Sequence, residues 1–343
     1  MRPLLRTLPG PAPAPAVPPV EVVLFGLGAI GIEVARAARA RTGLRVVGAV
    51  DVDPAKVGRD LGEVCGEAPW GVPVRADLGD LAGARVAVHT TGSFLPDVAP
   101  QLLALLERGL RVVSSAEELA FPGLRHPDLA ARLDRAARDA GTALVGVGVN
   151  PGFAMDALPL VLTTCCRSVR QVRVRRVVDT SRRRLNLQKK TGAGMTPAEF
   201  AAEMEGGRMG HIGLAESAAL LACGLGFAVT GIEDELAPIV TDYRRQSEFL
   251  TVEAGLVVGL HQFARAKAGP DTAVELELIM ALGGVADEDS VQVTGDPDLA
   301  LAIPGGLPGD VATVATLLNT VPRIVGATGL CTVLDLPLPH AAR

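Results

Sequence analysis

The feature that most constrains the fold of this chain is a glycine-rich segment that follows a short apolar run near the N-terminus. Residues 22–25 (Val-Val-Leu-Phe) have the character of a buried strand, and the pattern G-x-G-x-x-G follows directly. In such a strand-to-helix turn the first glycine permits a tight bend, the second lets the backbone approach a pyrophosphate, and the third lets the helix pack closely. The residues expected to contact a dinucleotide here are Gly26, Leu27, Gly28, Ala29, Ile30 and Gly31.

The residues after the glycines support this interpretation over a glycine-rich turn that binds nothing. Apolar residues at helical spacing predict a helix at 29–41, and its N-terminal N–H groups and dipole would favour an anion. A second strand, predicted at 44–50, ends in Asp51, twenty positions past Gly31. A carboxylate at that place accepts hydrogen bonds from the adenine ribose, so NAD is expected as cofactor. The nearby Lys56 and Arg59 leave use of NADP open, because loop cations can bind its extra phosphate.

Strand and helix patterns alternate from residue 20 to residue 149, which is typical of a Rossmann-type, doubly wound parallel sheet. Further strands are predicted at 72–74, 85–89, 110–113 and 143–147. In open α/β sheets ligands bind beyond the carboxyl ends of the strands. The polar and glycine residues that follow these strand ends, and are therefore expected along one rim, are Thr90, Thr91, Gly92, Ser114, Ser115, Glu117, Glu118 and Asn150.

The chain is expected to divide at Asn150-Pro151-Gly152 into two domains. We expect residues 1–19, with repeated Pro-Ala steps, to form a disordered tail, and residues 20–150 to form the dinucleotide-binding domain. Residues 151–307 predict an α+β domain for substrate binding and dimerisation, with a mixed sheet formed by long strands between 227 and 303. An apolar helix within 308–336 is expected to return to the first domain.

A loop predicted at 179–195 collects five of the basic residues, Arg182 to Arg184 and the pair Lys189-Lys190. These cations could clamp a substrate carboxylate. We expect instead that they face solvent or a dimer partner, as clustered loop cations usually do.

Composition excludes several classes of protein. A net charge of −5 with 3% aromatic residues leaves neither a basic groove nor a stacking platform for nucleic acid. No apolar run is long enough to span a bilayer, and the N-terminal tail lacks the apolar core of a signal peptide. The histidines have no i+4 partners and no C-x-x-C occurs, so no metal site is expected. Five cysteines without disulfide spacing favour a reducing cytoplasm.

Four candidate site residues have alternative interpretations. Asn150 could cap a helix that begins at Pro151, or it could contact a substrate. Glu117 and Glu118 could form an acidic helix start favoured by the dipole, or one of them could take part in catalysis. His211, expected near a helix N-terminus and therefore neutral, could hydrogen-bond a substrate or be purely structural.

Six motifs in the same order resemble the 2,4-diaminopentanoate dehydrogenases and their relatives, the native amine dehydrogenases. They are the glycine segment 26–31, V-V-S-S-A-E-E at 112–118, N-P-G-F at 150–153, K-T-G-A-G at 190–194, G-H-I-G-L-A-E-S at 210–217 and N-T-V-P-R at 319–323. The resemblance covers about residues 20–337 and implies an N-terminal domain similar to that of dihydrodipicolinate reductase. The chain lacks the His-His pair of those reductases, which argues against dihydrodipicolinate as substrate.

The resemblance implies NAD(P)-dependent oxidative deamination of an amine, and the reverse amination of a ketone or aldehyde with ammonia, in a homodimer. It places Glu117 where homoserine dehydrogenases have a lysine, so we expect Glu117 to be the catalytic residue beside the nicotinamide. The substrate-binding residues expected are Glu118, Asn150, Phe153, Met155 and His211, and Asn319 is expected to bind the cofactor. Two alternatives remain: a 2,4-diaminopentanoate dehydrogenase proper, and a dinucleotide-sensing protein without turnover.

Overall fold

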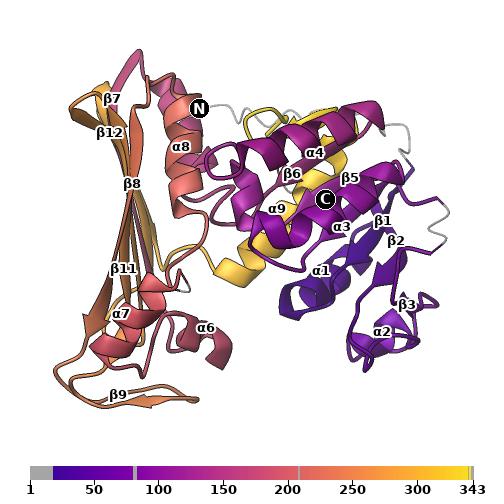
Figure 1. Cartoon of the computed structure of the whole chain (residues 1–343), viewed down its shortest axis with the longest axis horizontal. Coiled ribbons are helices and arrows are strands. Elements are labelled where there is room, and N and C mark those ends of the chain that lie inside the picture. The colour runs from indigo at the N-terminus through magenta and orange to yellow at the C-terminus, as the bar shows by residue number, and fades with distance from the viewer. Residues whose placement is uncertain (1–17, 80–82, 208, 339, 341–343) are drawn as a thin grey trace, which may run out of the picture.

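A computed structural model of the chain describes residues 18–79, 83–207, 209–338 and 340, so all but the last two residues of the predicted tail 1–19 lie outside the described residues. The chain forms two parts, which stand side by side in Figure 1. A parallel-sheet part contains β1 to β6, β15, α1 to α4 and α9, and a mixed-sheet part contains β7 to β14 and α5 to α8. None of the helices in the described residues is long and apolar enough to cross a membrane.

The first sheet has seven strands in the order β15-β6-β5-β4-β1-β2-β3, and all of its pairings are parallel. The predicted doubly wound parallel sheet is therefore confirmed. Sequence patterns did not predict the edge strand β15, which has only three residues. The strands are β1 (Val20–Phe25), β2 (Leu44–Val50), β3 (Val74–Arg75), β4 (Val86–His89), β5 (Arg111–Ser114), β6 (Ala143–Gly146) and β15 (Gly329–Cys331).

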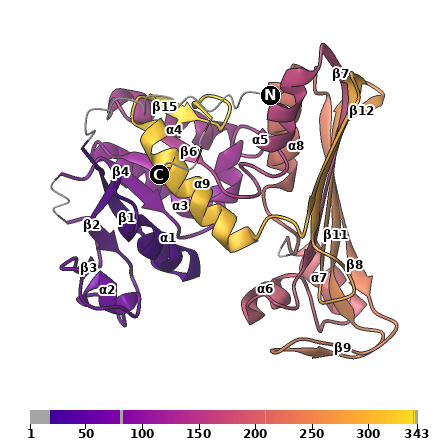
Figure 2. The ribbon, with the colours of Figure 1, turned by 180° about the vertical axis from the view of Figure 1, so that it is seen from behind.

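Helices cover both faces of this sheet because successive strand residues point to opposite sides. Helices α1 (Ala29–Arg39) and α9 (Gly309–Ile324) share one apolar core, into which Leu24 of β1 also points. Helices α3 (Leu95–Glu107) and α4 (Pro127–Asp139) share the core on the other face, with Val23. Helix α9 thus packs on the first sheet, and it lies diagonally across that sheet in Figure 2. The short elements are α2 (Leu61–Val64) and the 3-10 turn η1 (Glu117–Ala120).

The second sheet has six strands in the order β14-β13-β7-β12-β11-β8. Only the pairing of β7 with β12 is parallel, so the sheet is mixed, as predicted. Its strands are β7 (Ser168–Asp179), β8 (Gly231–Val240), β11 (Val257–Ala268), β12 (Asp271–Ala281), β13 (Glu288–Asp296) and β14 (Leu299–Pro304), and a separate pair consists of β9 (Arg245–Gln246) and β10 (Thr251–Val252).

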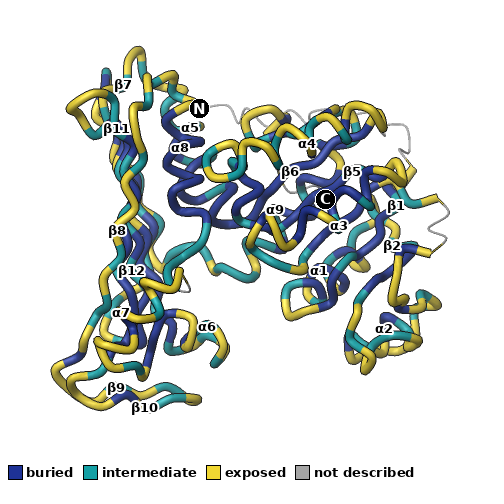
Figure 3. Tube along the Cα trace, viewed as in Figure 1, coloured by how far each residue is buried: buried dark blue, intermediate teal, exposed yellow. Residues whose placement is uncertain are grey.

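Among the described residues, the helices of the mixed-sheet part lie on one face of its sheet, the face toward the parallel-sheet part (Figures 1 and 2). Helix α8 (Leu214–Gly224) packs on β11 and β12 and also contacts η1, so it joins the two parts. It is buried along nearly its whole length (Figure 3). Helix α7 (Pro197–Glu205) begins with the capping box of Thr196 and Glu199 that the sequence predicts.

Two local predictions were wrong. A helix was expected from Pro151, but α5 (Ala157–Leu162), followed by the 3-10 turn η2 (Thr163–Cys165), begins six residues later. The Asp156 side chain caps it by accepting the N–H of Ala157. Asn150 is therefore no helix cap. The loop expected at 179–195 contains a short helix, α6 (Leu185–Lys190), which carries part of the basic cluster.

Candidate functional site

A cavity of about 610 Å³ lies between the two parts and is lined by residues of both. The carboxyl ends of β1, β4, β5 and β6 form one side. Strands β7, β11 and β12, helix α6, Gly207 and the loop residues 210–212 form the other. Of the predicted site residues, those that line it are Gly28, Ala29, Ile30, Thr90, Thr91, Gly92, Ser115, Glu117, Asn150 and His211.

The three glycines of the first turn have the geometry that their proposed tasks require. Gly26 adopts φ +94°, where only glycine is free of strain, and a Cβ there would lie 2.9 Å from the carbonyl oxygen of Thr90. A Cβ on Gly31 would overlap the carbonyl oxygen of Gly26, so the helix can pack this closely only with glycine. A Cβ on Gly28 would meet no atom within 4 Å. Open space at the N-terminus of α1, on the cavity wall, fits a pyrophosphate.

Asp51 lies beside this turn and is held by it. Its Oδ2 accepts the N–H of Leu27 at 2.6 Å, and Lys56 Nζ lies 3.5 Å from the same oxygen. The carboxylate is therefore fixed at the end of β2, where a ribose would be held. Arg59 is directed elsewhere, because its guanidinium bonds the carbonyl groups of Ala55 and Glu63. Its predicted contact with the cofactor has no support from this geometry.

The segment after β4 closes the other side of the turn. Thr90 Oγ1 donates to the carbonyl oxygen of Gly26 at 2.8 Å. Thr91 contacts the buried His89, whose Nδ1 lies 2.8 Å from Ser114 Oγ. Burial lowers the pKa of His89 to about 4, so its ring is neutral at physiological pH. Ser114 is therefore part of the support behind the cavity, whereas Ser115 lines it.

Glu117 lies in the cavity at the start of η1. Burial raises the pKa of its carboxyl, while a hydrogen bond from Ser93 and the positive charge of Lys190 act in the opposite direction. A Cβ on Gly213, which has φ +93°, would lie 3.1 Å from Cβ of Glu117, so the loop at 210–213 packs against this residue. A carboxyl with a raised pKa in a cavity can accept and return a proton near neutral pH.

Glu118 does not line the cavity, contrary to the expectation of a substrate contact. Its carboxylate is buried, and Oε2 accepts the N–H of Leu95 at 2.7 Å and contacts His126 Nε2 at 3.0 Å. Leu95 is the first residue of α3, so Glu118 satisfies a helix N-terminus and complements its dipole. The dipole explanation considered for the pair therefore fits Glu118.

Asn150 and His211 meet on the cavity wall. His211 Nε2 lies 3.1 Å from both the carbonyl oxygen and the Nδ2 of Asn150, so either tautomer finds a partner. Burial lowers the pKa of His211 to about 4, which keeps the ring neutral. The buried Met155 receives Asn150 Nδ2 on its sulfur and, like Phe153, does not line the cavity. Their predicted substrate contacts have no support from this arrangement.

Two further observations concern predicted ligands. Asn319 accepts a hydrogen bond from Arg41 at 2.9 Å, on the side of α9 toward α1, and does not line the cavity. Within the described residues there is no group of three or more His, Cys, Asp or Glu side chains that could hold a metal ion.

The part of the site that sequence patterns missed is the wall formed by the mixed-sheet part. Leu260, Leu278 and Met280 face the cavity from β11 and β12. Their alternation with partly exposed residues such as His261 and Glu277 could have identified the inward face of these strands, but not what it covers. The basic cluster was expected to face solvent or a partner, yet Arg183, Arg184 and Lys190 line the cavity.

The cavity-lining cations differ in their partners. Arg176 donates to both carboxylate oxygens of Asp289 at 2.6 Å, and Arg184 pairs with Asp310 at 3.4 Å. Arg183 and Lys190 form no ion pair with any residue that the structure describes. Arg183 and Lys190 therefore bring two positive charges to the cavity, and Lys190 is close enough to Glu117 to affect its pKa.

Comparison with known proteins identifies the family. Residues 20–114 match the model of the dihydrodipicolinate reductase N-terminus, and residues 153–343 match that of the 2,4-diaminopentanoate dehydrogenase C-terminal domain. The chain is 31% identical to the 2,4-diaminopentanoate dehydrogenase of Acetoanaerobium sticklandii over 94% of both chains. It is 32% identical to an amine dehydrogenase of Streptomyces virginiae over 47% of both.

A solved structure gives the same result. The amine dehydrogenase of Mycobacterium smegmatis superimposes with a TM-score of 0.84 at 26% identity, over 94% of this chain and 97% of that one. The resemblance expected from the six motifs is thus confirmed, in sequence and in fold. The chain belongs to the 2,4-diaminopentanoate dehydrogenase family.

Proposed function

We propose that this protein is an NAD(P)-dependent amine dehydrogenase, which converts an amine to a carbonyl compound plus ammonia and catalyses the reverse reductive amination. The observation that carries the proposal is the place of Glu117. Its carboxyl lies in the cavity between the glycine-rich turn and His211, and burial raises its pKa. A non-catalytic sensor has no need of a carboxyl group poised for proton transfer at that place.

The residues present fit a nicotinamide dinucleotide. The pyrophosphate would be held by backbone N–H groups at Gly28 to Ile30, and the adenine ribose by Asp51. The bound nicotinamide supplies the hydride chemistry. Asp51 would repel a 2′-phosphate, whereas Lys56, which lies 3.5 Å from it, could bind one. We therefore propose that NAD is used at least as well as NADP.

Glu117 would act on the nitrogen of the substrate. In its ionised form the carboxylate would accept a proton from the substrate amine, and in its protonated form it would return one during amination. The positive charge of Lys190 favours the ionised form, while burial favours the neutral form. The neutral His211 and the amide of Asn150 would direct hydrogen bonds toward the substrate without competing for that proton. The apolar wall of Leu260, Leu278 and Met280 would hold the carbon chain and exclude water.

A second candidate, the oxidation of 2,4-diaminopentanoate itself, is favoured by one observation. Arg183 and Lys190 line the cavity without an ion-pair partner among the described residues. A substrate carboxylate would satisfy both charges. A simple alkyl amine would leave them hydrated at the edge of an apolar wall. From the sequence we expected that the basic cluster would not clamp a substrate carboxylate. This observation weakens that expectation.

Oxidation of reduced nicotinamide cofactor in the presence of ketones or aldehydes and concentrated ammonium tests the proposed function. Turnover that requires both the carbonyl compound and ammonium is expected. Binding of the cofactor without turnover over a broad panel of carbonyl compounds would favour the sensor. Activity with 2,4-diaminopentanoate far above that with unfunctionalised amines would select the second candidate.

We also propose a cytoplasmic homodimer. In the part of the chain that the structure describes, no helix covers the outer face of the mixed sheet, and basic and acidic side chains pair on it, including Arg175, Glu277 and His261. A second copy of the chain could bury this face against itself in a two-fold arrangement. Sedimentation analysis is expected to give twice the monomer mass, and a monomer at micromolar concentration would contradict this.

A further inference from the structure

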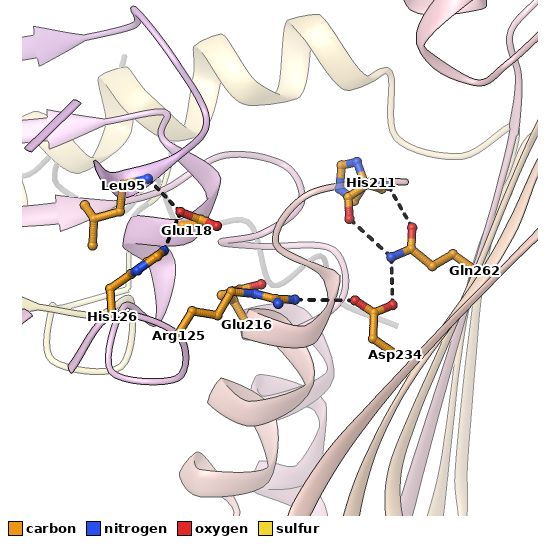
Figure 4. A network of polar contacts seen from close by, with 8 residues as sticks. All are labelled: Leu95, Glu118, Arg125, His126, His211, Glu216, Asp234 and Gln262. Carbon is orange, nitrogen blue, oxygen red and sulfur yellow. Dashed lines mark hydrogen bonds and ion pairs between the residues drawn. The ribbon is translucent and has the colours of Figure 1, made fainter. Parts of the chain in front are cut away.

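A chain of polar contacts runs from the parallel-sheet part to the loop of His211 (Figure 4). It begins at Arg125, in the segment before α4. Arg125 Nε donates to Oε1 of Glu216 on α8 at 2.7 Å, and Nη2 lies 3.4 Å from Oδ2 of Asp234 on β8. Arg125 thus holds two elements of the mixed-sheet part at once.

Glu216 holds Arg125, the first residue in this series of contacts. Glu216 is 1% exposed, and no described group bonds its Oε2, so Arg125 supplies the charge that compensates it. Burial raises the pKa of Glu216, and Arg125 counteracts the shift. Leaving this buried carboxylate without its partner would cost stability, so the guanidinium of Arg125 is held in place.

Asp234 in turn sets the orientation of Gln262. Gln262 is buried on the inner face of β11, and its Nε2 donates to Oδ1 of Asp234 at 2.9 Å. An ionised carboxylate only accepts hydrogen bonds, so the NH₂ group of the amide must face Asp234. The amide oxygen must then face the opposite way.

The oriented amide holds the main chain of His211. Gln262 Oε1 accepts the His211 N–H at 2.7 Å, and Nε2 lies 3.4 Å from the His211 carbonyl oxygen. The His211 ring reaches Asn150 from this fixed backbone, and Gly213, two residues on, packs against Glu117. The backbone of His211, on the cavity wall, is therefore held by the side-chain amide of Gln262.

We propose that Arg125, Asp234 and Gln262 are positioning residues for the reaction. Arg125 and Asp234 fix the Gln262 amide, and Gln262 holds the His211 loop at the distance from Glu117 that the substrate requires. None of the three lines the cavity, so each acts through the His211 loop. The inference rests on the proposed function, because it takes the cavity at Glu117 as the place of reaction.

Asp234→Asn is the sharpest test, because an asparagine can present either an oxygen or an NH₂ group to Gln262 and so allows the amide to turn. Asp134→Asn is the matched control. Asp134 also accepts from an arginine and from a donor N–H, and its side chain is 34% exposed against 33% for Asp234. We expect Asp234→Asn to lower kcat/KM for the carbonyl substrate about tenfold, with the Kd for the cofactor unchanged. Asp134→Asn should change neither.

Further variants of Gln262 and Arg125 separate the positioning of the His211 loop from the stability of the fold. Gln262→Met keeps the volume of the side chain but removes its hydrogen bonds to Asp234 and to His211. It should lower kcat/KM more than Asp234→Asn does. Gln262→Glu should not restore activity, since a carboxylate cannot donate to Asp234. Arg125→Lys should recover part of what Arg125→Met loses. Adding Glu216→Gln to Arg125→Met removes the unpaired buried charge and should restore the melting temperature without restoring kcat/KM.

Amide hydrogen exchange of the segment 209–213 gives a readout that needs no substrate. Faster exchange is expected in Asp234→Asn and Gln262→Met but not in Asp134→Asn. If the wild type turns over none of the carbonyl compounds while these exchange differences appear, the proposed function fails. The inference that Asp234 and Gln262 hold the His211 loop in place then still stands. Unchanged exchange and unchanged kcat/KM in Asp234→Asn, or equal losses in Asp134→Asn, would overturn the inference.

Discussion

Replacement of Glu117 by Gln removes the proton-accepting group from the cavity and keeps nearly everything else. Glutamine has almost the same volume and can still accept the hydrogen bond from Ser93. General acid–base catalysis contributes about 10²- to 10⁴-fold in rate, so kcat should fall by that factor, about 2.7–5.5 kcal/mol of transition-state stabilisation. The dissociation constant of the cofactor should stay the same, since the glycine-rich turn and Asp51 lie apart from the substituted group.

The same substitution should leave the fold at least as stable. Burial raises the pKa of Glu117, so the folded protein binds this proton more tightly than the unfolded chain. Stability that this group contributes at low pH is lost as the pH rises through its folded pKa. The neutral glutamine escapes that loss, so the melting temperature of Glu117→Gln above neutral pH should equal or exceed that of the wild type. In the wild type, kcat/KM for amine oxidation should rise with pH through the raised pKa of Glu117, and this limb should vanish in the variant.

Glu118→Gln is the control and should show the opposite pattern. Its carboxylate bonds the N-terminus of α3 and His126, so the substitution should cost about 1–3 kcal/mol of stability while kcat changes little. Initial rates and urea unfolding of both variants measure the two effects. Near-normal turnover of Glu117→Gln together with an inactive Glu118→Gln would refute the assignment. If both variants stay active, the proton carrier lies elsewhere, and His211 is the next residue to replace.

Five further predictions concern the cofactor, the stability of the fold, the substrate and pH. Gly28→Ala should weaken cofactor binding about tenfold, or about 1.4 kcal/mol, with little change in melting temperature, because its Cβ meets no protein atom within 4 Å. Gly31→Ala should instead destabilise the fold by about 1–3 kcal/mol, because its Cβ overlaps a backbone carbonyl. Asp51→Ser should raise kcat/KM with NADP relative to NAD, and a wild-type preference of a hundredfold for NADP would show that Asp51 does not bind the ribose. If a carboxylate is clamped, Lys190→Met should raise KM for 2,4-diaminopentanoate and not for an alkyl amine; equal effects would exclude the clamp. His89 has a folded pKa lowered to about 4, so its contribution to stability is lost as the pH falls from about 6.5 toward 4. Between pH 7 and 5 this loss is about 2 kcal/mol, which His89→Gln should remove from the unfolding free energy in urea.

The sequence was sufficient for strands β1 to β6 of the parallel sheet because each local signal there agrees with the global arrangement. The glycine-rich pattern predicts one kind of turn, from a strand into a helix. The strands at 44–50 and 143–147 are apolar runs between helical patterns. The rim predicted from strand ends includes Thr90, Glu117 and Asn150, which line the cavity, because topology alone brings carboxyl ends together. Glu117, which was expected to be catalytic, lines the cavity, whereas Glu118, which was expected to contact the substrate, does not.

What could not be predicted depends on contacts between distant segments. Glu118 and Met155 have the same chemistry as site residues, but tertiary packing turns them toward Leu95 and Asn150. The basic cluster at 182–190 was expected to face solvent or a partner, since no local pattern shows that α6 lies opposite the glycine turn. The strand β15 is three residues long, and only its place beside β6 makes it a strand.

The placement of α9 has a consequence for how the chain is made. Val314, Leu317, Leu318, Val321 and Ile324 complete the core beneath α1, yet they are encoded more than 160 residues after β6. At about 5–20 residues per second, a ribosome needs roughly 10 to 35 s to synthesise that interval. During this time one face of the nascent sheet has no cover from α9, so a chaperone that shields this apolar surface should raise the yield of native protein.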